Sequence, residues 1–543
     1  MRIWRIFQFL VVNPVHSNSN GLQKGSIEIM KYNLTLAAIS MIVGFLAAQW
    51  FFGSIRSTVT LIPPVVSPVA APEVAKPENE FRFTLTTADI PLDREYPTVV
   101  ADQKNNVVVV AWAAATLPNS GNTRRTIWMT RSSDGGRNYD APKPWREVPV
   151  YAYTSSASNK LISESLKKED EKSEPVEKSK PTRAPMTFST HILPRLIMAG
   201  DRMILGWVEA LNGGPKAVFY IAESTDGGLS FGEPRSIGGS DSSRPGFISL
   251  AADEKGLILA SWLDNPTKSD NTNGKKLDSS GSGGAKVFAA REKQDKSGFE
   301  PIRLVYEGPD GKGVCPCCDV TVAASSENHM LYAFRNNVGD IRDIWIGNVN
   351  GDKTIAPAAL SSRGWKFAGC PHDGPSMIKA DNKIITGWMD AKDGKPRVYL
   401  SEFDQAKPKE IQTMPVTPSF EGSQSHLKII PDNKSGIYMA WDQSELKQPG
   451  MHGDHKSDSS QTSTARGIVV AHRPNGFQSI QSRIEFKSSA DRLPRNPAIA
   501  VTEDGVILAW TELGGKEGKS VRIQRIDQSS LDNSLAISGV KAP

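Results

Sequence analysis

One pattern is repeated seven times along this sequence: a short apolar run, a polar turn, and a second apolar run that ends in an aromatic residue. The copies end at Trp112, Trp207, Trp262, Phe334, Trp388, Trp441 and Trp510. Where no long insertion intervenes, the copies follow one another at about 54 residues. A fixed period of this size, with apolar residues alternating at every second position, is typical of a β-propeller with one four-stranded sheet per repeat. We therefore predict an all-β fold, a β-propeller of seven four-stranded blades, with six blades as the alternative.

The order of the apolar runs predicts where each strand lies within a blade. The first run is expected to form the innermost strand, the run that ends in the aromatic residue the second, and a run after the next loop the third. The last copy has only a third strand before a polar tail at 531–543, so residues 80–88 are expected to supply its outer strand and close the ring. The propeller then spans residues 80–530. A charged insertion at 155–185 is poor in apolar residues and is expected to be disordered.

An uncharged apolar run precedes the repeats. Leu34–Ile55 is long enough to span a bilayer, and residues 32–55 are predicted to form a transmembrane anchor, with a cleaved signal as the alternative. Basic residues are more frequent in the tail, 1–31, than just after the run, so the propeller is expected on the periplasmic or extracellular side of the cell membrane. A Pro-rich stretch at 56–79 is expected to be an extended linker. The sequence thus predicts a single-pass membrane protein.

The charge of the chain argues against a nucleic-acid partner. Lys and Arg together number 64, Asp and Glu together 59, and the small excess is spread along the chain. Proteins that bind nucleic acids gather their basic residues in one patch or segment. We therefore expect no nucleic acid among the partners.

Two turns between expected third and fourth strands share the pattern Ser-x-Asp-x-Gly-x-x-aromatic. One contains Ser132, Asp134, Gly136 and Tyr139, and the other contains Ser224, Asp226, Gly228 and Phe231. In such a turn the Asp accepts hydrogen bonds from backbone amides, the Gly supplies a positive φ, and the aromatic ring packs beneath. Both turns resemble the Asp box, or BNR repeat, of the sialidase superfamily. An Asp box specifies a fold rather than an activity.

A wider resemblance rests on the segments CPCC, at 315–318, and GCPHDGP, at 369–375. With the two turns, these segments make residues 80–530 similar to a bacterial, exported, sialidase-like propeller family that is often labelled exo-α-sialidase. The resemblance implies a propeller, export and glycoside chemistry. Sialidases bind the substrate carboxylate with three arginines, and the family's arginine-containing entry to the first blade is absent here; its nearest match is Arg495, in the last repeat.

Ligands of a propeller bind at the rim formed by the entrances of the innermost strands and the loops after the second strands. Arg335 and Arg342 flank one hairpin of the fourth repeat on this rim, and two guanidinium groups there suit a carboxylate or sulfate. The alternative is that each pairs with an acid of the rim. Asp373 is the candidate catalytic acid/base. The substrate-binding candidates are Arg335, Arg342, Arg244, Arg495 and His372, and other residues at equivalent positions include Arg94, His191, Arg195, Asp319, His426 and Asp442.

These features together predict an exported propeller that binds or hydrolyses an anionic glycan or another carbohydrate. Enzymatic activity stays open, with exo-α-sialidase-like glycoside hydrolysis as the candidate reaction. The first alternative is a non-catalytic binding or assembly propeller with a protein partner. The second is a metal-binding periplasmic protein.

Three of the four cysteines lie close together in the sequence. Cys315, Cys317 and Cys318 lead into the innermost strand of the fourth repeat, and Cys370 leads into that of the fifth. Neighbouring blades bring these entrances together, and an oxidising compartment favours disulfides, so we predict the pairs Cys315–Cys318 and Cys317–Cys370. One alternative is a Zn²⁺ or Cu⁺ site made by the thiolates with His372, and another is a redox-active dithiol. No cofactor is favoured by the sequence.

Overall fold

The structure is a computed structural model that describes residues 73–74, 80–84, 96–116, 124–149, 152–154, 187–189, 193–211, 216–238, 245–264, 285–311, 313–326, 329–405, 407–445, 466–476, 479–489, 491–514 and 520–536. The chain divides into two units, Met1–Thr58 and Val59–Pro543, and every described residue belongs to the second. The predicted tail and membrane anchor lie outside the described residues, as does the insertion at 155–185. Within the described part of the chain, no helix is both long and apolar enough to cross a membrane.

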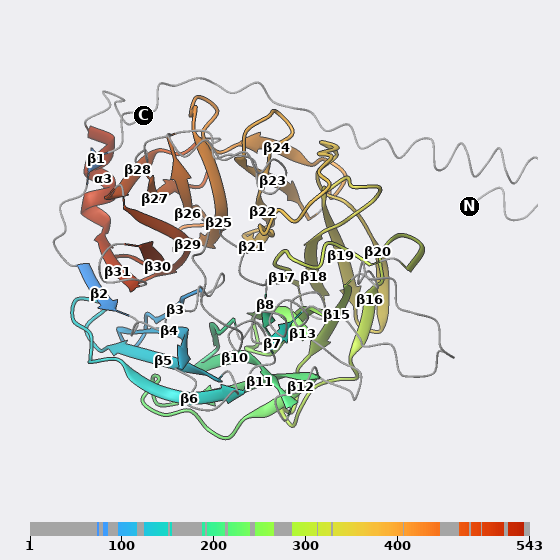
Figure 1. Ribbon diagram of the computed structural model, residues 1–543, viewed down its shortest axis with the longest axis horizontal. Coiled ribbons are helices and arrows are strands. Elements are labelled where there is room, and N and C mark those ends of the chain that lie inside the picture. The colour runs from blue at the N-terminus through green and yellow to red at the C-terminus, as the bar shows by residue number, and fades with distance from the viewer. Residues whose placement is uncertain are drawn as a thin grey trace, which may run out of the picture. The chain divides into compact units, whose positions relative to one another are not determined.

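Seven antiparallel sheets of four strands follow one another along the chain (Figure 1). Blade 1 contains β3 (Thr98–Asp102), β4 (Val107–Thr116), β5 (Arg124–Ser132) and β6 (Lys143–Pro149). Blade 2 contains β9 (Arg195–Ala199), β10 (Arg202–Ala210), β11 (Ala217–Ser224) and β12 (Arg235–Gly238). Blade 3 contains β13 (Pro245–Ala252), β14 (Ile258–Asp264), β15 (Lys286–Arg291) and β16 (Arg303–Tyr306). Blade 4 contains β17 (Thr321–Ser326), β18 (His329–Arg335), β19 (Ile344–Asn350) and β20 (Lys353–Ala359).

The last three blades complete the set. Blade 5 contains β21 (Ser376–Ala380), β22 (Lys383–Asp390), β23 (Arg397–Asp404) and β24 (Gln412–Pro415). Blade 6 contains β25 (Ser423–Pro431), β26 (Ile437–Ser444), β27 (Arg466–Arg473) and β28 (Ser482–Ser488). Blade 7 contains β29 (Arg492–Val501), β30 (Gly505–Gly514), β31 (Ser520–Asp527) and β2 (Glu80–Thr84). A short pair, β7 (Ala152–Thr154) with β8 (Thr187–Ser189), and a 3-10 turn, η3 (Pro309–Gly311), lie outside the blades.

The innermost strands form a closed ring. Each of β3, β9, β13, β17, β21, β25 and β29 contacts the innermost strands of both neighbouring blades, and β29 contacts β3. β2 pairs antiparallel with β31, so an N-terminal strand completes the last sheet. The prediction of a seven-bladed propeller is therefore confirmed, and so is its closure by a strand that precedes the first repeat. Closure of the ring leaves only short, protected sheet edges.

Two further elements, which were also not predicted, lie beside the last two blades. β1 (Glu73–Val74), within the expected linker, adds a parallel fifth strand to blade 6 beside β28. α3 (Gln528–Ala536) follows β31 directly and contacts strands of blades 6 and 7. Both additions reinforce the place where the two ends of the propeller meet.

The repeated aromatic residue lies on the second strand of each blade and is at most 2% exposed in all seven copies. The rings pack against third-strand aromatics: Trp207 stacks on Tyr220, Trp262 on Phe288 and Trp388 on Tyr399, at centroid separations of 5.8, 5.9 and 6.1 Å. Large aromatic side chains bury the most apolar area per residue and so dominate core energetics. The apolar core therefore lies within and between the blades.

The two Ser-x-Asp-x-Gly turns connect third to fourth strands and have the predicted local chemistry. Asp134 Oδ1 accepts hydrogen bonds from the amides of Arg137 and Asn138 at 3.0 and 2.9 Å. Burial opposes ionisation, but hydrogen bonds from Asn138 and Ser132 lower the pKa of Asp134 to about 2. Gly136 has a φ of 86°, and a Cβ there would meet Ile507 Cδ1, in blade 7, at 2.5 Å. The turn of blade 1 thus packs against the preceding blade, which explains the need for glycine.

Hydroxyl side chains on the innermost strands tie neighbouring blades together. Each accepts a hydrogen bond from a backbone amide of the next innermost strand at 3.0 to 3.2 Å: Leu196 to Thr98, Val322 to Ser249, Met377 to Thr321 and Ile429 to Ser376. In blades 2 and 6 the equivalent position holds Arg195 and Lys428. Blade 7 has Ala498 at this position. The side chains of Arg195 and Lys428 place positive charge in the central channel.

Candidate functional site

A cavity of about 240 Å³ lies at the mouth of the central channel, lined by residues from all seven blades. Asp319, which leads into β17, lies between the two cations: Arg195 Nη2 is 3.4 Å from its Oδ1 and Lys428 Nζ is 3.2 Å from its Oδ2. Burial would raise the pKa of Asp319, but the charges of Lys428 and Arg195 hold it below its ordinary value. The channel mouth is therefore an internal ion-pair cluster that links blades 2, 4 and 6.

Arg335 does not face the rim. Its side chain is buried, with 1% of the residue exposed, and its three nitrogens donate hydrogen bonds to carbonyl oxygens: Nε to Asp373, Nη1 to Arg342 and Nη2 to Met389, at 2.9, 2.7 and 2.7 Å. These carbonyls belong to blades 4 and 5. Three of its five N–H groups are thus used inside the protein, and the holding of a ligand anion by Arg335 stays a prediction.

Arg342 is likewise directed into the protein. Its Nε donates to the carbonyl of Phe367 at 3.0 Å, its Nη2 lies 3.7 Å from a carboxylate oxygen of Asp340, and the residue is 7% exposed. Substrate binding by Arg342 likewise stays a prediction. The alternative, in which these arginines hold rim loops together, is closer to the structure. Arg244, the third arginine of the expected cationic wall, lies outside the described residues, as do Arg94 and His191.

Asp373 is 2% exposed and its carboxylate serves the backbone. Oδ2 accepts a hydrogen bond from the amide of His426 at 2.6 Å, while Oδ1 is buried without a hydrogen-bond partner. Burial raises the pKa of Asp373, and the charges of His426 and Arg335 partly oppose this shift. An acid/base group must reach the substrate, and this carboxyl group is enclosed. The role of Asp373 as the catalytic acid/base therefore stays a prediction.

His426 and Asp442 form a close pair on the rim of blade 6. His426 Nδ1 lies 2.6 Å from Asp442 Oδ2, which also accepts a hydrogen bond from the amide of Asn496 at 3.3 Å. Burial alone would lower the pKa of His426, but the charge of Asp442, its hydrogen bond and the charge of Asp373 together raise it above 6.5. The imidazole is therefore held in its charged form to higher pH than an ordinary histidine.

Two arginines flank this pair. Arg495 lies in β29 and Arg466 opens β27, and both are half-buried. Among the described residues, neither guanidinium has a hydrogen bond or an ion pair, although other rim arginines such as Arg363 and Arg146 are paired with acids. Arg495 acts electrostatically on both His426 and Arg466, and burial followed by the charge of Arg495 lowers the pKa of Arg466. We call Arg466, Arg495 and His426 the cationic rim site.

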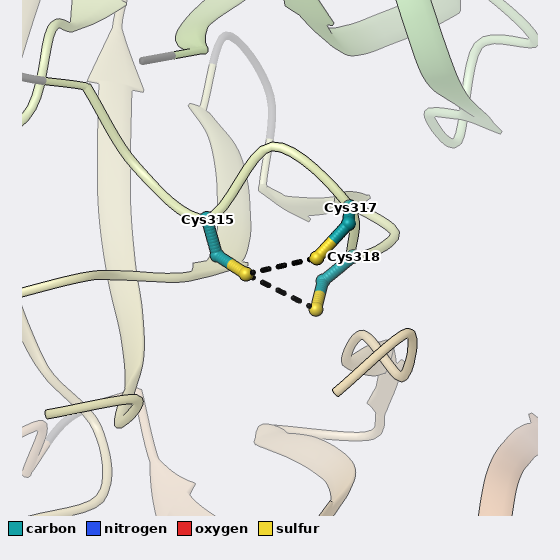
Figure 2. Close-up of side chains that lie close together, drawn as sticks. All are labelled: Cys315, Cys317 and Cys318. Atoms are coloured by element: carbon teal, nitrogen blue, oxygen red, sulfur yellow. Dashed lines mark hydrogen bonds between the residues drawn. The ribbon is translucent and has the colours of Figure 1, made fainter. Parts of the chain in front are cut away.

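The cysteines converge but are not bonded. Cys315 Sγ lies 3.4 Å from the sulfurs of both Cys317 and Cys318, well beyond the ~2.05 Å of a disulfide. None of the four cysteines forms a disulfide, and Cys370 packs against the other three. Figure 2 shows the three buried cysteines. The predicted meeting of the two strand entrances is confirmed, whereas the predicted pairs Cys315–Cys318 and Cys317–Cys370 are not formed in this structure.

His372 does not join the sulfurs. It is half-buried with a φ of 58°. Within the described residues, the side chains whose metal-binding atoms all lie within 4.8 Å of one another are Cys315, Cys317 and Cys318. The structure therefore brings together three of the five ligands considered from the sequence. Substrate binding by His372 stays a prediction.

Comparisons with known proteins give matches in structure alone. No family model and no curated protein matches the sequence. Solved structures similar to the chain include a protein of unknown function from Dyadobacter fermentans (10% identity, TM-score 0.39, covering 83% of this chain and 97% of that one). A Hadza microbial sialidase gives 10% identity and a TM-score of 0.39 over 80% of this chain and 66% of that one. The Trypanosoma rangeli sialidase in complex with the inhibitor DANA gives 11% identity and a TM-score of 0.36 over 66% and 58%.

The match covers less than two thirds of the length of the two sialidases. The propeller assignment rests on the strand pairing and the closed ring of this chain itself.

Sequence reasoning missed two of the charged residues that the structure brings forward. Lys428 lies at the channel mouth because the bulge between Ser425 and Lys428 sets which side chains of β25 point inward, and the sequence does not reveal a bulge. Arg466 is the first residue of β27 and follows a long loop, so it looks like part of the insertion. A basic residue at the start of a third strand, in a blade with an acid directly after the repeated Trp, is the signal that could have identified it.

Proposed function

We propose that the protein binds an anionic glycan at the cationic rim site, with a carboxylate or sulfate group held between Arg466 and Arg495. The observation that carries this proposal is a pair of half-buried guanidinium groups that have no acid partner among the described residues. Removing a guanidinium from water is costly unless an anion or a set of acceptors replaces the lost solvation. A bound carboxylate would do so with bidentate hydrogen bonds, the geometry for which arginine is suited.

The neighbouring pair supports an anion at the same place. His426 is held in its charged form by Asp442, so three cationic side chains border the site while Asp442 is already occupied by His426 and by the amide of Asn496. Asp373, the next acid, is turned into the protein and has a raised pKa because it is buried. The local field at the rim is therefore positive, which attracts anions and raises their association rate.

The proposal that the ligand is a glycan rests on other observations. Two turns of blades 1 and 2 resemble the Asp boxes of the sialidase superfamily, and their hydrogen bonding fits that reading. Several similar solved structures are sialidases by name, one of them in complex with the inhibitor DANA. We propose binding rather than hydrolysis, because the carboxyl group expected to act as acid/base is enclosed and bonded to a backbone amide.

The proposed cellular location follows from the N-terminal sequence. We infer that residues 32–55 anchor the chain in the membrane and that the propeller faces the periplasmic or extracellular side. Proteolysis of intact spheroplasts tests this location: a protease added outside should digest the propeller. Protection until the membrane is lysed would contradict it.

The binding proposal is tested by calorimetry on the full chain with sialyllactose, 6-sulfolactose and neutral lactose. The two anionic sugars should bind and lactose should not. Arg466→Gln and Arg495→Gln should each weaken binding about 10- to 100-fold, because each removes a charged hydrogen bond worth about 1.5–3 kcal/mol. Arg137→Gln, which removes one exposed charge from the turn at Asp134, is the matched control and should leave affinity unchanged.

Two results would contradict the proposal. Equal affinity for lactose would show that the anion is not recognised, and unchanged affinity in the Arg466→Gln/Arg495→Gln double variant would show that the ligand binds elsewhere. The same samples should release no free sialic acid from sialyllactose. Steady release that is lost in the double variant would convert the binding site into an active site.

A further inference from the structure

The three buried sulfurs lie in the loop that leads into blade 4. Cys315, Cys317 and Cys318 are 1%, 7% and 1% exposed, and Figure 2 shows their side chains pointing toward one another from a single turn of backbone. All three sulfur atoms lie within 4.8 Å of one another, and two of the separations are 3.4 Å. We call these residues the thiol cluster. The thiol cluster is buried in the protein, and it shares no residue with the cationic rim site.

The sulfur spacing is closer to that of a metal site than to that of a disulfide. A disulfide requires a separation of ~2.05 Å. Thiolates bound to one metal at about 2.3 Å are about 3.8 Å apart, which lies between the 3.4 Å contacts and the 4.8 Å limit of the cluster. Small side-chain rotations would therefore bring all three sulfurs onto one ion, without a change of the backbone.

Two arginines adjoin the thiol cluster. Arg335 is fully buried, yet its hydrogen bonds go to neutral carbonyls and, among the described residues, no carboxylate lies within ion-pair distance of it. Buried charges in proteins are normally compensated. The amide of Cys315 donates to the carbonyl of Arg335 at 3.1 Å, so the backbones of the two residues are hydrogen-bonded. Arg335 and Arg342 both act electrostatically on Cys315.

We propose that Cys315, Cys317 and Cys318 bind one Cu(I) ion through their three sulfur atoms. Three thiolates with one monovalent cation carry two negative charges, and the two neighbouring guanidinium groups balance them. Soft thiolate ligands select soft cations, Cu(I) foremost among those that accept three sulfurs. Structural Zn²⁺ takes four ligands, and the remaining cysteine, Cys370, is half-buried and lies outside the group of mutually close atoms.

Cys370 has a separate place in the proposal. It belongs to the entrance of blade 5, packs against the cluster and is more exposed than the other three. It therefore lies between the buried sulfurs and solvent, where it can pass the ion inward without being required in the final site. A bound ion would also fix the loop that Arg335 joins to blade 5. This proposal is independent of the glycan site.

The proposal is tested on the purified full chain, reduced and kept anaerobic. Cu(I) held by bicinchoninate is titrated with the protein, and the loss of the coloured complex reports transfer. We expect one Cu(I) per chain, with a new near-ultraviolet absorption from sulfur-to-copper charge transfer. Cys315→Ser should lose stoichiometric binding, whereas Cys370→Ser, the matched control, should keep it. Iodoacetamide should then label Cys370 alone in the copper-loaded wild type and all four cysteines after denaturation without metal.

The bicinchoninate titration of the wild-type chain keeps the test decisive even where a buried serine prevents folding, because it uses no variant. The proposal is overturned if the reduced protein takes no Cu(I) from bicinchoninate, or if Cys315→Ser binds as well as the wild type. It is also overturned if Zn²⁺ alone binds stoichiometrically and requires Cys370, or if the freshly isolated protein contains two disulfides that exclude metal.

Discussion

Replacing Arg335 by Ala tests the finding that this arginine is structural. The side chain donates charged hydrogen bonds to three buried carbonyls and lies 5.3 Å above the ring of Trp365. A hydrogen bond with one charged partner contributes about 1.5–3 kcal/mol, and an unsatisfied buried carbonyl costs about 1–3 kcal/mol. Part of this loss is offset because the variant no longer buries a charge. Breaking a buried charged network typically costs about 3–5 kcal/mol, and we expect a destabilisation of that size.

The assay is urea unfolding followed by tryptophan fluorescence and by circular dichroism. Arg335→Ala should lower the midpoint strongly. Arg335→Lys keeps the charge but not the planar array of donors, so its urea midpoint should lie between those of Arg335→Ala and the wild type. Arg137→Ala, which removes a surface ion pair with a 47% exposed side chain, should change stability by less than about 1 kcal/mol. An unchanged midpoint for Arg335→Ala together with lost glycan affinity would refute the structural assignment and restore Arg335 as a ligand-binding residue.

Two further predictions follow from local geometry. Gly136→Ala should destabilise the protein by more than the about 1–3 kcal/mol that an unfavourable positive φ costs, because the added methyl group also clashes with Ile507. Gly476→Ala, at a φ of 83° with open space around it, should cost only the backbone strain. Equal shifts of the melting temperature in the two variants would contradict this prediction. In Asp442→Asn the pKa of His426 should fall. A raised pKa of His426 in the folded state stabilises the fold below the unfolded pKa of 6.5, and this stabilisation is lost as pH rises through the folded pKa. The variant should therefore lose stability mainly at low pH. An unchanged titration of His426 by NMR would count against the His426–Asp442 pair.

The architecture could be predicted because its determinants are local and repeated. Each Trp of the repeat, such as Trp207 or Trp441, is flanked by period-two apolar runs, and such a strand can be buried only against neighbouring sheets. The unpaired third strand before the tail required a partner, and β2 supplies it. β1 escaped prediction because a two-residue strand carries no periodic signal.

The roles of rim residues could not be predicted in the same way. The sequence places Arg335 at the end of a second strand, but its direction is set by carbonyls of Asp373 and Met389, which lie in another blade. Backbone acceptors carry no sequence signature, so a structural arginine and a ligand-binding arginine look alike. Arg495 was proposed for a cationic wall, and the structure gives it an unforeseen neighbour in Arg466. That binding role stays a prediction.

The cysteines illustrate a related limit. That Cys370 would meet the cluster followed from the adjacency of blades 4 and 5. Whether sulfurs that meet are bonded depends on separations of about an ångström, and those depend on how the turn at 315–318 folds. Sequence spacing alone does not determine a distance of that kind.

The most direct test of the central claim is a crystal structure of the protein with sialyllactose bound. We predict the carboxylate of the ligand between Arg466 and Arg495, with N–H···O distances of about 2.7–2.9 Å to both guanidinium groups, and with Arg335 still bonded to its three carbonyls. A ligand bound at the channel mouth, or both guanidinium groups paired with acids of the protein itself, would contradict the account.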